Sequence, residues 1–235
     1  DSTVRNYLLG DESLVERVTA LECRRRSAFG NGTEVAAMNE CAGRTVRIYD
    51  ALTAQTAYLL AVYRHRPQTI AALERMIGAY VLERTSELGS VGRGARVTGA
   101  RFVREVRIGD GAVIDGATLL ENGTLCAGAF VGADVKARDF ILAEGARVDN
   151  GSILERCFVG ESSVLDKGFT ATHSLFFANC HCECGEAASV FAGPYTVSHH
   201  KSTLLIAGMF SFFNAGSGSN QSNHLFKSGA VHQSV

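Results

Sequence analysis

The sequence predicts an all-β solenoid interrupted by a helical segment, and two periodicities carry this prediction. From Val91 to about Cys180, apolar residues recur at every seventeenth position, beside Gly, Asp and Asn. A fixed period of this length is typical of chains in which each repeat buries its apolar face only against its neighbours. Between residues 50 and 87 the apolar steps change to three and four, which is typical of amphipathic helices.

Three columns of residues define the solenoid. Within one repeat they are separated by 6, 6 and 5 residues, so each coil has three short sides joined by tight corners. Stacked sides become short parallel strands that are buried on their inner face. Each buried aliphatic contributes about 1.5–3 kcal/mol before ordering entropy is subtracted, so several coils must stack. The columns are Val91, Ile108, Leu125, Leu142, Val159 and Phe176; Val97, Ile114, Val131, Val148 and Leu165; and Val103, Leu120, Ala137, Leu154 and Ala171.

The stretch IGDGAV-IDGATL-LENGTL, residues 108–125, repeats one six-residue pattern three times: an aliphatic residue, Gly or an acidic residue, two variable positions, a small residue and one more. In this it resembles the hexapeptide-repeat family. The resemblance implies a left-handed parallel β-helix of triangular section, and homotrimers with sites in the clefts between neighbouring solenoids.

Three regions are expected along the chain. Residues 1–49 are expected to form N-terminal β-helix coils, because LGDES (9–13) and FGNGT (29–33) follow the same pattern. Residues 50–87 are expected to form an inserted helical hairpin, with helices over about 51–65 and 67–87 and Pro67 in the favoured first turn. The main β-helix is expected over 88–235. The columns are lost after Cys180, which predicts an irregular, site-forming segment over 181–235.

The candidate catalytic residues are His199 and His200, in that C-terminal segment. Lys201 follows them, and a neighbouring cation disfavours a charged imidazole and leaves a neutral base. In hexapeptide-repeat acyltransferases, which the fold resembles, a His deprotonates the hydroxyl or amine that attacks a thioester. The alternative interpretation is that both His are polar residues of an exposed turn.

Short polar residues and glycines follow, and they are the candidate substrate-binding groups. Gly lets a ligand approach the backbone, and amides and hydroxyls hydrogen-bond a sugar or phosphate. Nearby Phe residues argue against the alternative of a flexible linker. Backbone amides of Gly216 and Gly218 are expected to stabilise an oxyanion or phosphate. The predicted binding set is Lys201, Asn214, Gly216, Gly218, Asn220, Gln221, Asn223 and His224.

No metal site is predicted. His181, Cys182 and Cys184 suggest zinc, but no second ligand pair stands at a suitable spacing. Cys-x-Cys on a strand would place both thiols on one face. Glu183 and Glu186 could orient a His, although solvated acidic corners are the commoner arrangement.

A second resemblance covers most of the chain. HSLFFANC (173–180), FAGPYTVSHHKSTLLIAG and MFSFFNAGSGSNQSNH resemble segments of a bacterial family of larger hexapeptide-repeat proteins of unassigned function, sometimes labelled sugar-nucleotide pyrophosphorylase-related. This resemblance implies that the chain is a fragment of a longer protein, and it supplies no catalytic residue.

Three functional hypotheses follow. The first is a transferase that moves an acyl group to a sugar or sugar nucleotide, with acyl-CoA as the co-substrate and no other cofactor implied. The second is a non-catalytic scaffold or ligand-binding protein. The third is a metal-dependent hydratase.

Composition narrows the partners. The net charge of the 235 residues is −1, which argues against a nucleic-acid partner. No apolar run approaches the roughly 18 residues of a membrane span, and no signal-peptide pattern opens the chain. The 7 cysteines show no regular framework, which favours a reducing compartment, the cytoplasm.

Overall fold

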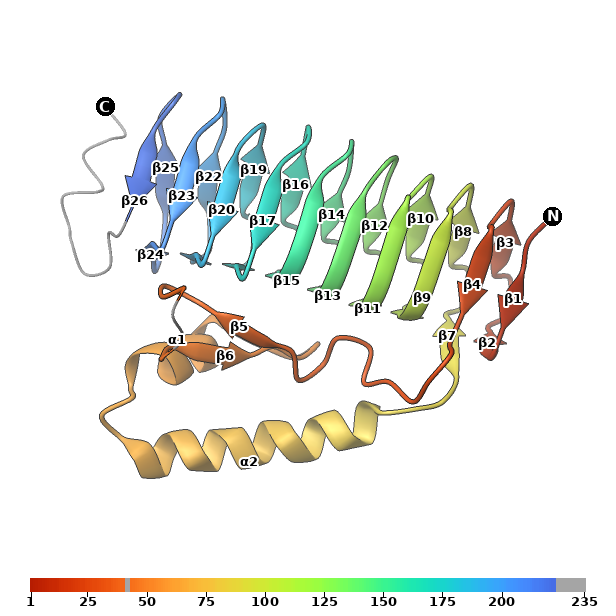
Figure 1. The fold of residues 1–235 in the computed structure, drawn as a ribbon, viewed down its shortest axis with the longest axis horizontal. Coiled ribbons are helices and arrows are strands. Elements are labelled where there is room, and N and C mark those ends of the chain that lie inside the picture. Colours follow the sequence, from red (N-terminus) through yellow and green to blue (C-terminus); the bar gives the residue numbers. More distant parts are fainter. Residues whose placement is uncertain (41–42, 223–235) are drawn as a thin grey trace.

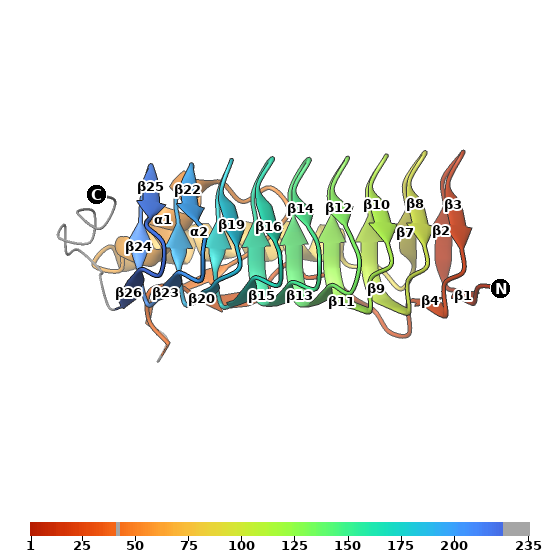
Figure 2. The same cartoon turned by 90° about the horizontal axis from the view of Figure 1, so that it is seen from above.

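A computed structural model describes residues 1–40 and 43–222 of the chain. It shows a row of stacked parallel strands, with two helices and an extended segment along one side (Figures 1 and 2). Two parallel sheets form the sides of the solenoid, one of 15 strands and one of 9. The structure is therefore mostly β, and its long parallel sheets fit the expected solenoid.

The larger sheet makes two sides of each coil and the smaller sheet makes the third. The larger sheet contains β1 (Val4–Arg5), β2 (Tyr7–Leu9), β4 (Ala20–Glu22), β7 (Gly89–Val91), β9 (Phe102–Ile108), β11 (Leu119–Leu125), β13 (Lys136–Leu142), β15 (Ile153–Val159), β17 (Thr170–Thr172), β18 (Leu175–Phe176), β20 (Glu186–Ala188), β21 (Phe191–Ala192), β23 (Thr203–Leu205), β24 (Gly208–Met209) and β26 (Asn220–Ser222). The smaller sheet contains β3 (Leu14–Glu16), β8 (Arg96–Thr98), β10 (Val113–Asp115), β12 (Phe130–Val131), β14 (Arg147–Val148), β16 (Val164–Asp166), β19 (His181–Glu183), β22 (Thr196–Ser198) and β25 (Phe213–Ala215).

Each seven-residue strand of the larger sheet bends around one corner of a coil. The bend falls on a residue in the left-handed region, such as Asn122 at φ 51° in β11. This residue is skipped in the ladder, which pairs Glu121 with Arg138 and Gly123 with Phe140. Equivalent corner residues stack from coil to coil: Glu105, Asn122, Asp139, Arg156 and His173.

The three predicted columns fill the interior of the solenoid. Every column residue from Val91 to Phe176 is at most 2% exposed. The small residues four positions after the first column are buried with them, from Ala95 to Cys180. Strand register advances by one repeat, as Leu119 pairs with Lys136. The prediction of inward-facing columns is confirmed.

The C-terminal segment differs from the expectation, because the coils continue through Ser222 instead of ending at Cys180. The seventeen-residue spacing is lost after Cys180 because one corner is a residue shorter. Asp166 pairs with Glu183, but Thr170 pairs with Glu186, so a residue is missing between them. With that shift the interior column continues through Ala187 and Leu204, which are at most 1% exposed.

Phe169 packs next to the shortened corner. Its side chain is fully buried inside the solenoid, and its ring packs edge-on to Phe176 with 6.0 Å between centroids. Gly185 follows it in the ladder, since Thr170 N donates to Gly185 O. A Cβ on Gly185 would lie 3.2 Å from the Phe169 ring and 2.5 Å from Ser202 O. The Phe169 ring in one coil is thus accommodated because the next coil has Gly185, which has no side chain, beside it.

The N-terminal region also differs from the expectation. Residues 1–22 form the first coil and the start of the second, but FGNGT (29–33) is not part of a coil. The chain leaves the solenoid after β4, and β5 (Glu34–Ala36) and β6 (Thr45–Arg47) pair antiparallel in a sheet of their own. The chain re-enters at β7, which pairs with β2 and β9. The insertion therefore begins near residue 23, earlier than the expected residue 50, and interrupts the second coil.

Two helices lie within the insertion. Helix α1 (Ala54–Val62) begins after Thr53, whose Oγ1 accepts a hydrogen bond from Thr56 N at 3.2 Å. Helix α2 (Pro67–Arg84) has Pro67 in its first turn, as expected. Figure 1 shows α2 lying along the solenoid axis, whereas α1 is seen nearly end-on. Only Ile70 and Ile77 of α2 are buried, so this helix is a surface element.

A second apolar core joins the insertion to the solenoid. It forms because one outward-facing ladder of the coils is apolar, where a free solenoid face would be polar. This ladder pairs Ile141 with Phe158, Phe158 with Leu175 and Leu175 with Phe191. The insertion covers it with Val35, Met38, Val46, Ile48, Leu52, Leu60 and Ile77.

The first part of the insertion, residues 23–38, is called the arm, and corner residues of successive coils form hydrogen bonds with it. Glu105 Oε1 accepts from Arg24 N at 2.9 Å, and Asn122 Oδ1 accepts from Gly30 N at 3.0 Å. Further along, His173 Nδ1 accepts from Ala36 N at 3.1 Å. Ser189 O then accepts from Met38 N at 2.7 Å. The arm is therefore held from the second coil to the coils at the other end.

Replacing Gly185 by Ala is expected to destabilise the solenoid by about 1–3 kcal/mol, because the added methyl group overpacks the interior against Ser202 O. The control is Gly78→Ala in α2, where the nearest atom would be 3.7 Å away. That change is expected to be neutral or stabilising by about 0.5–1 kcal/mol. Urea unfolding measures both, and equal free energies of unfolding in the two variants would contradict the packing argument.

The bond from Ala36 N to His173 is expected to depend on pH. Burial, followed by the charge of Arg156, lowers the pKa of His173 from its ordinary value of 6.5. A neutral ring accepts this bond and a protonated ring cannot. Its contribution is therefore complete above pH 6.5 and is lost as the pH falls through the lowered pKa.

Hydrogen exchange of the 34–37 segment measures this effect. His173→Asn keeps an acceptor and tolerates the left-handed backbone, but it does not titrate. As the pH is lowered, the protection of this segment from hydrogen exchange should decrease more in the wild type than in this variant. An identical pH profile in both proteins would exclude the role of His173.

Candidate functional site

The candidate site lies at one corner of the smaller sheet, where β19 and β22 end. His181 pairs with Val197 and Cys182 with Ser198, so Glu183 and His199 occupy adjacent levels of the same corner. Asp166 stands one level below, because it pairs with Glu183. The predicted His199 is thus brought next to two residues from the preceding coil, His181 and Glu183.

Four side chains are in contact at this corner. His181 Nε2 lies 2.9 Å from Glu183 Oε1, and Lys167 Nζ lies 2.6 Å from Glu183 Oε2. The His181 and His199 rings meet edge-on with 4.7 Å between centroids. Glu183 is therefore held by a cation on one oxygen and by an imidazole on the other. Glu183 therefore contacts a His, which is the less common of the two arrangements considered from the sequence.

Burial and charge set the protonation of this cluster. The hydrogen bond from Lys167, with a further one from His181, lowers the pKa of Glu183 and keeps it ionised. Burial, followed by the charge of His181, lowers the pKa of His199, so its ring is neutral. His199 Nε2 is buried and has no hydrogen-bond partner. A buried ring nitrogen without a partner is rare in proteins and requires an explanation.

His200 is exposed, in contrast to His199. It occupies the left-handed corner position at φ 57°, in the same column as Lys167 at φ 54° and Cys184 at φ 52°. Its ring lies edge-on to His199 with 5.8 Å between centroids. Of the two predicted bases, His200 is the one that a substrate can reach from solvent.

A groove of about 430 Å³ runs beside this corner. Lys167 and Lys201 line it with Cys184, Glu186, Ser202 and Thr203. Lys167 is paired with Glu183, whereas Lys201 has no ion-pair partner within the described part of the chain. The groove therefore offers the ammonium group of Lys201 and two hydroxyl groups to an anionic group of a ligand, together with the carboxylate of Glu186.

Some of the other predicted binding residues are exposed in the structure, and others are buried or already hydrogen-bonded. Asn214 and Asn220 are exposed, on β25 and β26. Gln221 is buried inside the solenoid, where it pairs with Leu204, so it does not face a ligand. Gly218 N donates to His200 O at 3.1 Å, so this amide is not available to an oxyanion. Gly216 O accepts from Ser219 N and Ser202 Oγ, both at 3.0 Å. Asn223 and His224 lie outside the described residues.

The two cysteines of the rejected zinc motif do not share a face. Cys182 points into the core and is fully buried, and burial raises the pKa of its thiol. Cys184 is exposed, because it lies at the corner after β19 has ended. The expectation that a strand aligns both thiols is wrong, since the strand does not reach Cys184.

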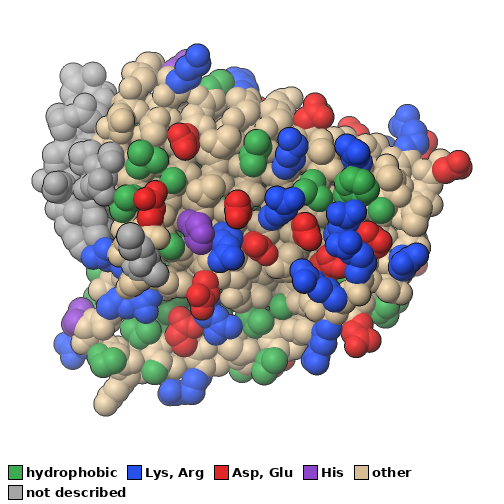
Figure 3. Space-filling view, in the orientation of Figure 1, with side chains coloured by type: hydrophobic (Ala, Val, Ile, Leu, Met, Phe, Trp, Pro, Cys, Tyr) green, Lys and Arg blue, Asp and Glu red, His purple; other side chains and the backbone are tan. Residues whose placement is uncertain are grey.

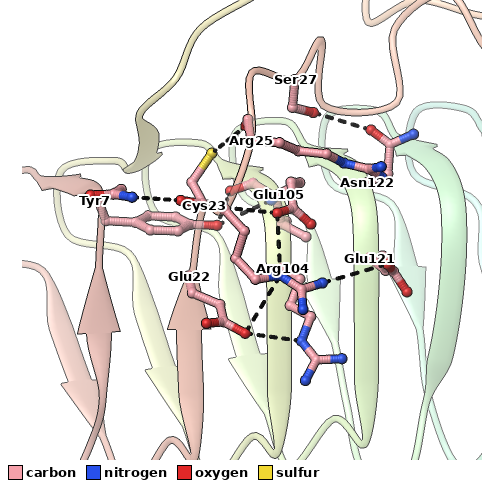
Figure 4. Close-up of polar contacts among 12 residues, drawn as sticks. Tyr7, Glu22, Cys23, Arg25, Ser27, Arg104, Glu105, Glu121 and Asn122 are labelled. Atoms are coloured by element: carbon pink, nitrogen blue, oxygen red, sulfur yellow. Dashed lines mark hydrogen bonds and ion pairs between the residues drawn. The ribbon is translucent and has the colours of Figure 1, made fainter.

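A separate polar cluster lies where the insertion leaves the solenoid (Figure 4). Arg24 lies 3.7 Å from both Glu22 and Glu105, and 3.9 Å from Glu121. The Tyr7 hydroxyl donates to Val106 O at 2.8 Å. Glu105 is only 1% exposed, yet Arg24 N and the Arg24 side chain hold one of its oxygens. These contacts connect the first three coils to the arm, and we assign the cluster a structural role.

Charges are mixed over the rest of the visible surface. On the face shown in Figure 3, basic and acidic side chains are intermingled. Several form ion pairs between adjacent coils, such as Arg104 with Glu22 at 3.1 Å and Arg138 with Glu121 at 3.5 Å. This face carries no extended patch of one sign.

The cluster of His181, Glu183 and His199 did not emerge from the sequence, although the signal was there. Asp149, Asp166 and Glu183 follow the seventeen-residue spacing, and His199 follows after sixteen. The shortened corner concealed that last step. Allowing one deletion would have placed Glu183 beneath His199.

A family model described as a domain of unknown function (DUF4954) matches residues 1–235, the whole chain. The chain belongs to the DUF4954 family. An uncharacterized protein of Treponema pallidum (strain Nichols) is 24% identical to this DUF4954 chain over 221 residues. The match covers 88% of the chain and 30% of that protein, so the chain spans about a third of the relative's length. No solved structure matches the DUF4954 chain. In the described ranges, 1–40 and 43–222, neither helix is long and apolar enough to cross a membrane.

Proposed function

We propose that the chain is a transferase of the hexapeptide-repeat type, which moves an acyl group from acyl-CoA to a sugar or sugar nucleotide. The observation that carries this proposal is an exposed imidazole, His200, which immediately precedes Lys201 in the chain, and the Lys201 side chain lines the groove. A lysine in the groove next to a base suits a substrate that carries phosphate. The hexapeptide resemblance supports a left-handed coil and a homotrimer.

His200 would act as the general base. Its ring takes the proton of the acceptor hydroxyl or amine, and the freed lone pair attacks the thioester carbonyl. The carbon–sulfur bond then breaks, and the CoA thiolate leaves with the proton that His200 returns. Lys201 would bind substrate phosphate through its free ammonium group. Asn214 and Asn220, exposed on the adjacent coil, would add amide contacts.

The proposal places the protein in the cytoplasm, where acyl-CoA and sugar nucleotides are available. The free cysteines support a reducing compartment: Cys23, Cys126, Cys157, Cys180, Cys182 and Cys184. Burial raises the pKa of Cys126 and Cys157 to about 12, so these two thiols are unreactive.

A non-catalytic scaffold is the second candidate, and exposed apolar residues favour it. Met76 and Leu82 of α2 are 53% and 70% exposed. In this role the helical hairpin of the insertion would present them to a partner protein, and His200 would have no chemical task.

Replacing His200 by Ala tests the transferase. Thermal shift against acetyl-CoA, longer acyl-CoAs and uridine-diphosphate sugars first identifies ligands, since binding raises the melting temperature. Release of CoA thiol in the presence of both substrates then measures turnover. His200→Ala is expected to lower turnover by about 10²–10⁴-fold without changing the ligand-induced shift.

The matched control is His65→Ala, which removes an exposed His between α1 and α2. Its turnover should equal that of the wild type. Lys201→Ala should weaken the thermal shift produced by phosphorylated ligands. Unchanged turnover in the His200 variant would eliminate the base, and the absence of a shift with every acyl-CoA would favour the scaffold.

A further inference from the structure

The corner cluster offers three metal-ligating side chains that converge from two adjacent coils. His181, Glu183 and His199 each present one ligand atom, and these atoms lie within 4.8 Å of one another. His181 and Glu183 are at the two ends of β19, and His199 comes directly after β22. Because parallel strands fix the register, this convergence is built into the backbone.

The hydrogen bonding of the cluster is incomplete in a way that a cation would complete. His199 Nε2 is buried without a partner. His181 Nε2 and Glu183 Oε1 share a hydrogen bond of 2.9 Å. A metal ion in the centre would replace the shared proton and also give His199 Nε2 the partner that it lacks.

Lys167 binds the second carboxylate oxygen of Glu183. Its ammonium group lies 2.6 Å from Glu183 Oε2, while Glu183 Oε1 is in contact with His181. A second group that fixes the free oxygen of a ligating carboxylate is a regular feature of metal sites. The half-exposed His181 and Lys167 side chains leave a path from solvent.

We propose that His181, Glu183 and His199 bind a divalent transition-metal ion, with Zn²⁺ as the class that these ligands fit best. Two imidazoles and one carboxylate form the ligand set of zinc sites that keep an open fourth position. The same set also binds iron(II), whereas Ca²⁺ and Mg²⁺ prefer oxygen ligands alone.

Binding requires a small side-chain movement. Ligand bonds of about 2.0–2.2 Å in tetrahedral geometry place the ligand atoms roughly 3.3–3.6 Å apart. His181 Nε2 and Glu183 Oε1, which are 2.9 Å apart, must therefore separate slightly, and the ligand atoms at the larger separations, up to 4.8 Å, must come closer by rotation of the His181 or His199 ring. This site does not depend on the proposed acyl transfer, because His200 and Lys201 are not ligands in it.

Metal content and cobalt absorption test the site. The tag-free protein is loaded with Zn²⁺, dialysed and analysed for metal, and Co²⁺ is titrated while its visible absorption is recorded. One equivalent of Zn²⁺ and an intense tetrahedral Co²⁺ band are expected. His199→Ala and Glu183→Gln should each weaken binding by about 100-fold or more.

His200→Ala and His65→Ala are the matched controls, since each removes an imidazole outside the cluster and should retain the full equivalent. Glu183→Gln preserves the shape of the side chain, so it remains informative if His199→Ala unfolds, which circular dichroism detects. Absence of bound metal in the wild type would overturn the proposal. Equal Zn²⁺ affinity in Glu183→Gln and wild type would overturn it as well, because the metal would then be bound elsewhere.

Discussion

The register between coils is the constraint on which the rest of the structure depends. Each strand pairs in parallel with its equivalent one coil away, so every side chain stacks on the same position of the next coil. Interior columns are therefore occupied by apolar or small residues along their length. The packing of one level limits the next, as the ring of Phe169 and the bare backbone of Gly185 show. Polar residues in the interior are mostly small, such as Ser163 and Ser198, and the larger Gln221 lies at the last described level.

The same stacking organises the outside of the solenoid. Corner residues in the left-handed conformation point away from the coils and form a ladder of acceptors for the arm of the insertion. Beside them, the apolar ladder through Phe158 and Leu175 provides the surface that the insertion buries. At another corner, where the strands of the smaller sheet end, stacking places Glu183 one level from His199 and forms the candidate site. One repeat thus produces a packed interior, a docking surface and a polar cluster.

Much of the fold was predictable from the sequence, because a solenoid depends on local spacing. The columns from Val91 to Phe176 and both helices were identified from periodicity alone. The path of residues 23–49 was not, since FGNGT fits the hexapeptide pattern and only the long-range contacts of the arm determine its place. The apolar outward positions Ile141, Phe158 and Leu175 would have indicated a covered face. Only part of the candidate site was predictable. His199 and His200 were identified from the sequence. Their proximity to His181 and Glu183 was not, because the one-residue deletion between these coils breaks the strict seventeen-residue spacing.

The arm of the insertion changes how the solenoid responds to stress. In a simple solenoid each coil contacts only its neighbours, so the ends can fray while the centre persists. Here the arm starts at the second coil and its Met38 amide is bound to Ser189, many levels away. Opening the C-terminal coils therefore also strips the arm from the coils before them. The tether couples distant levels, and the molecule should melt as one cooperative unit instead of unwinding from one end.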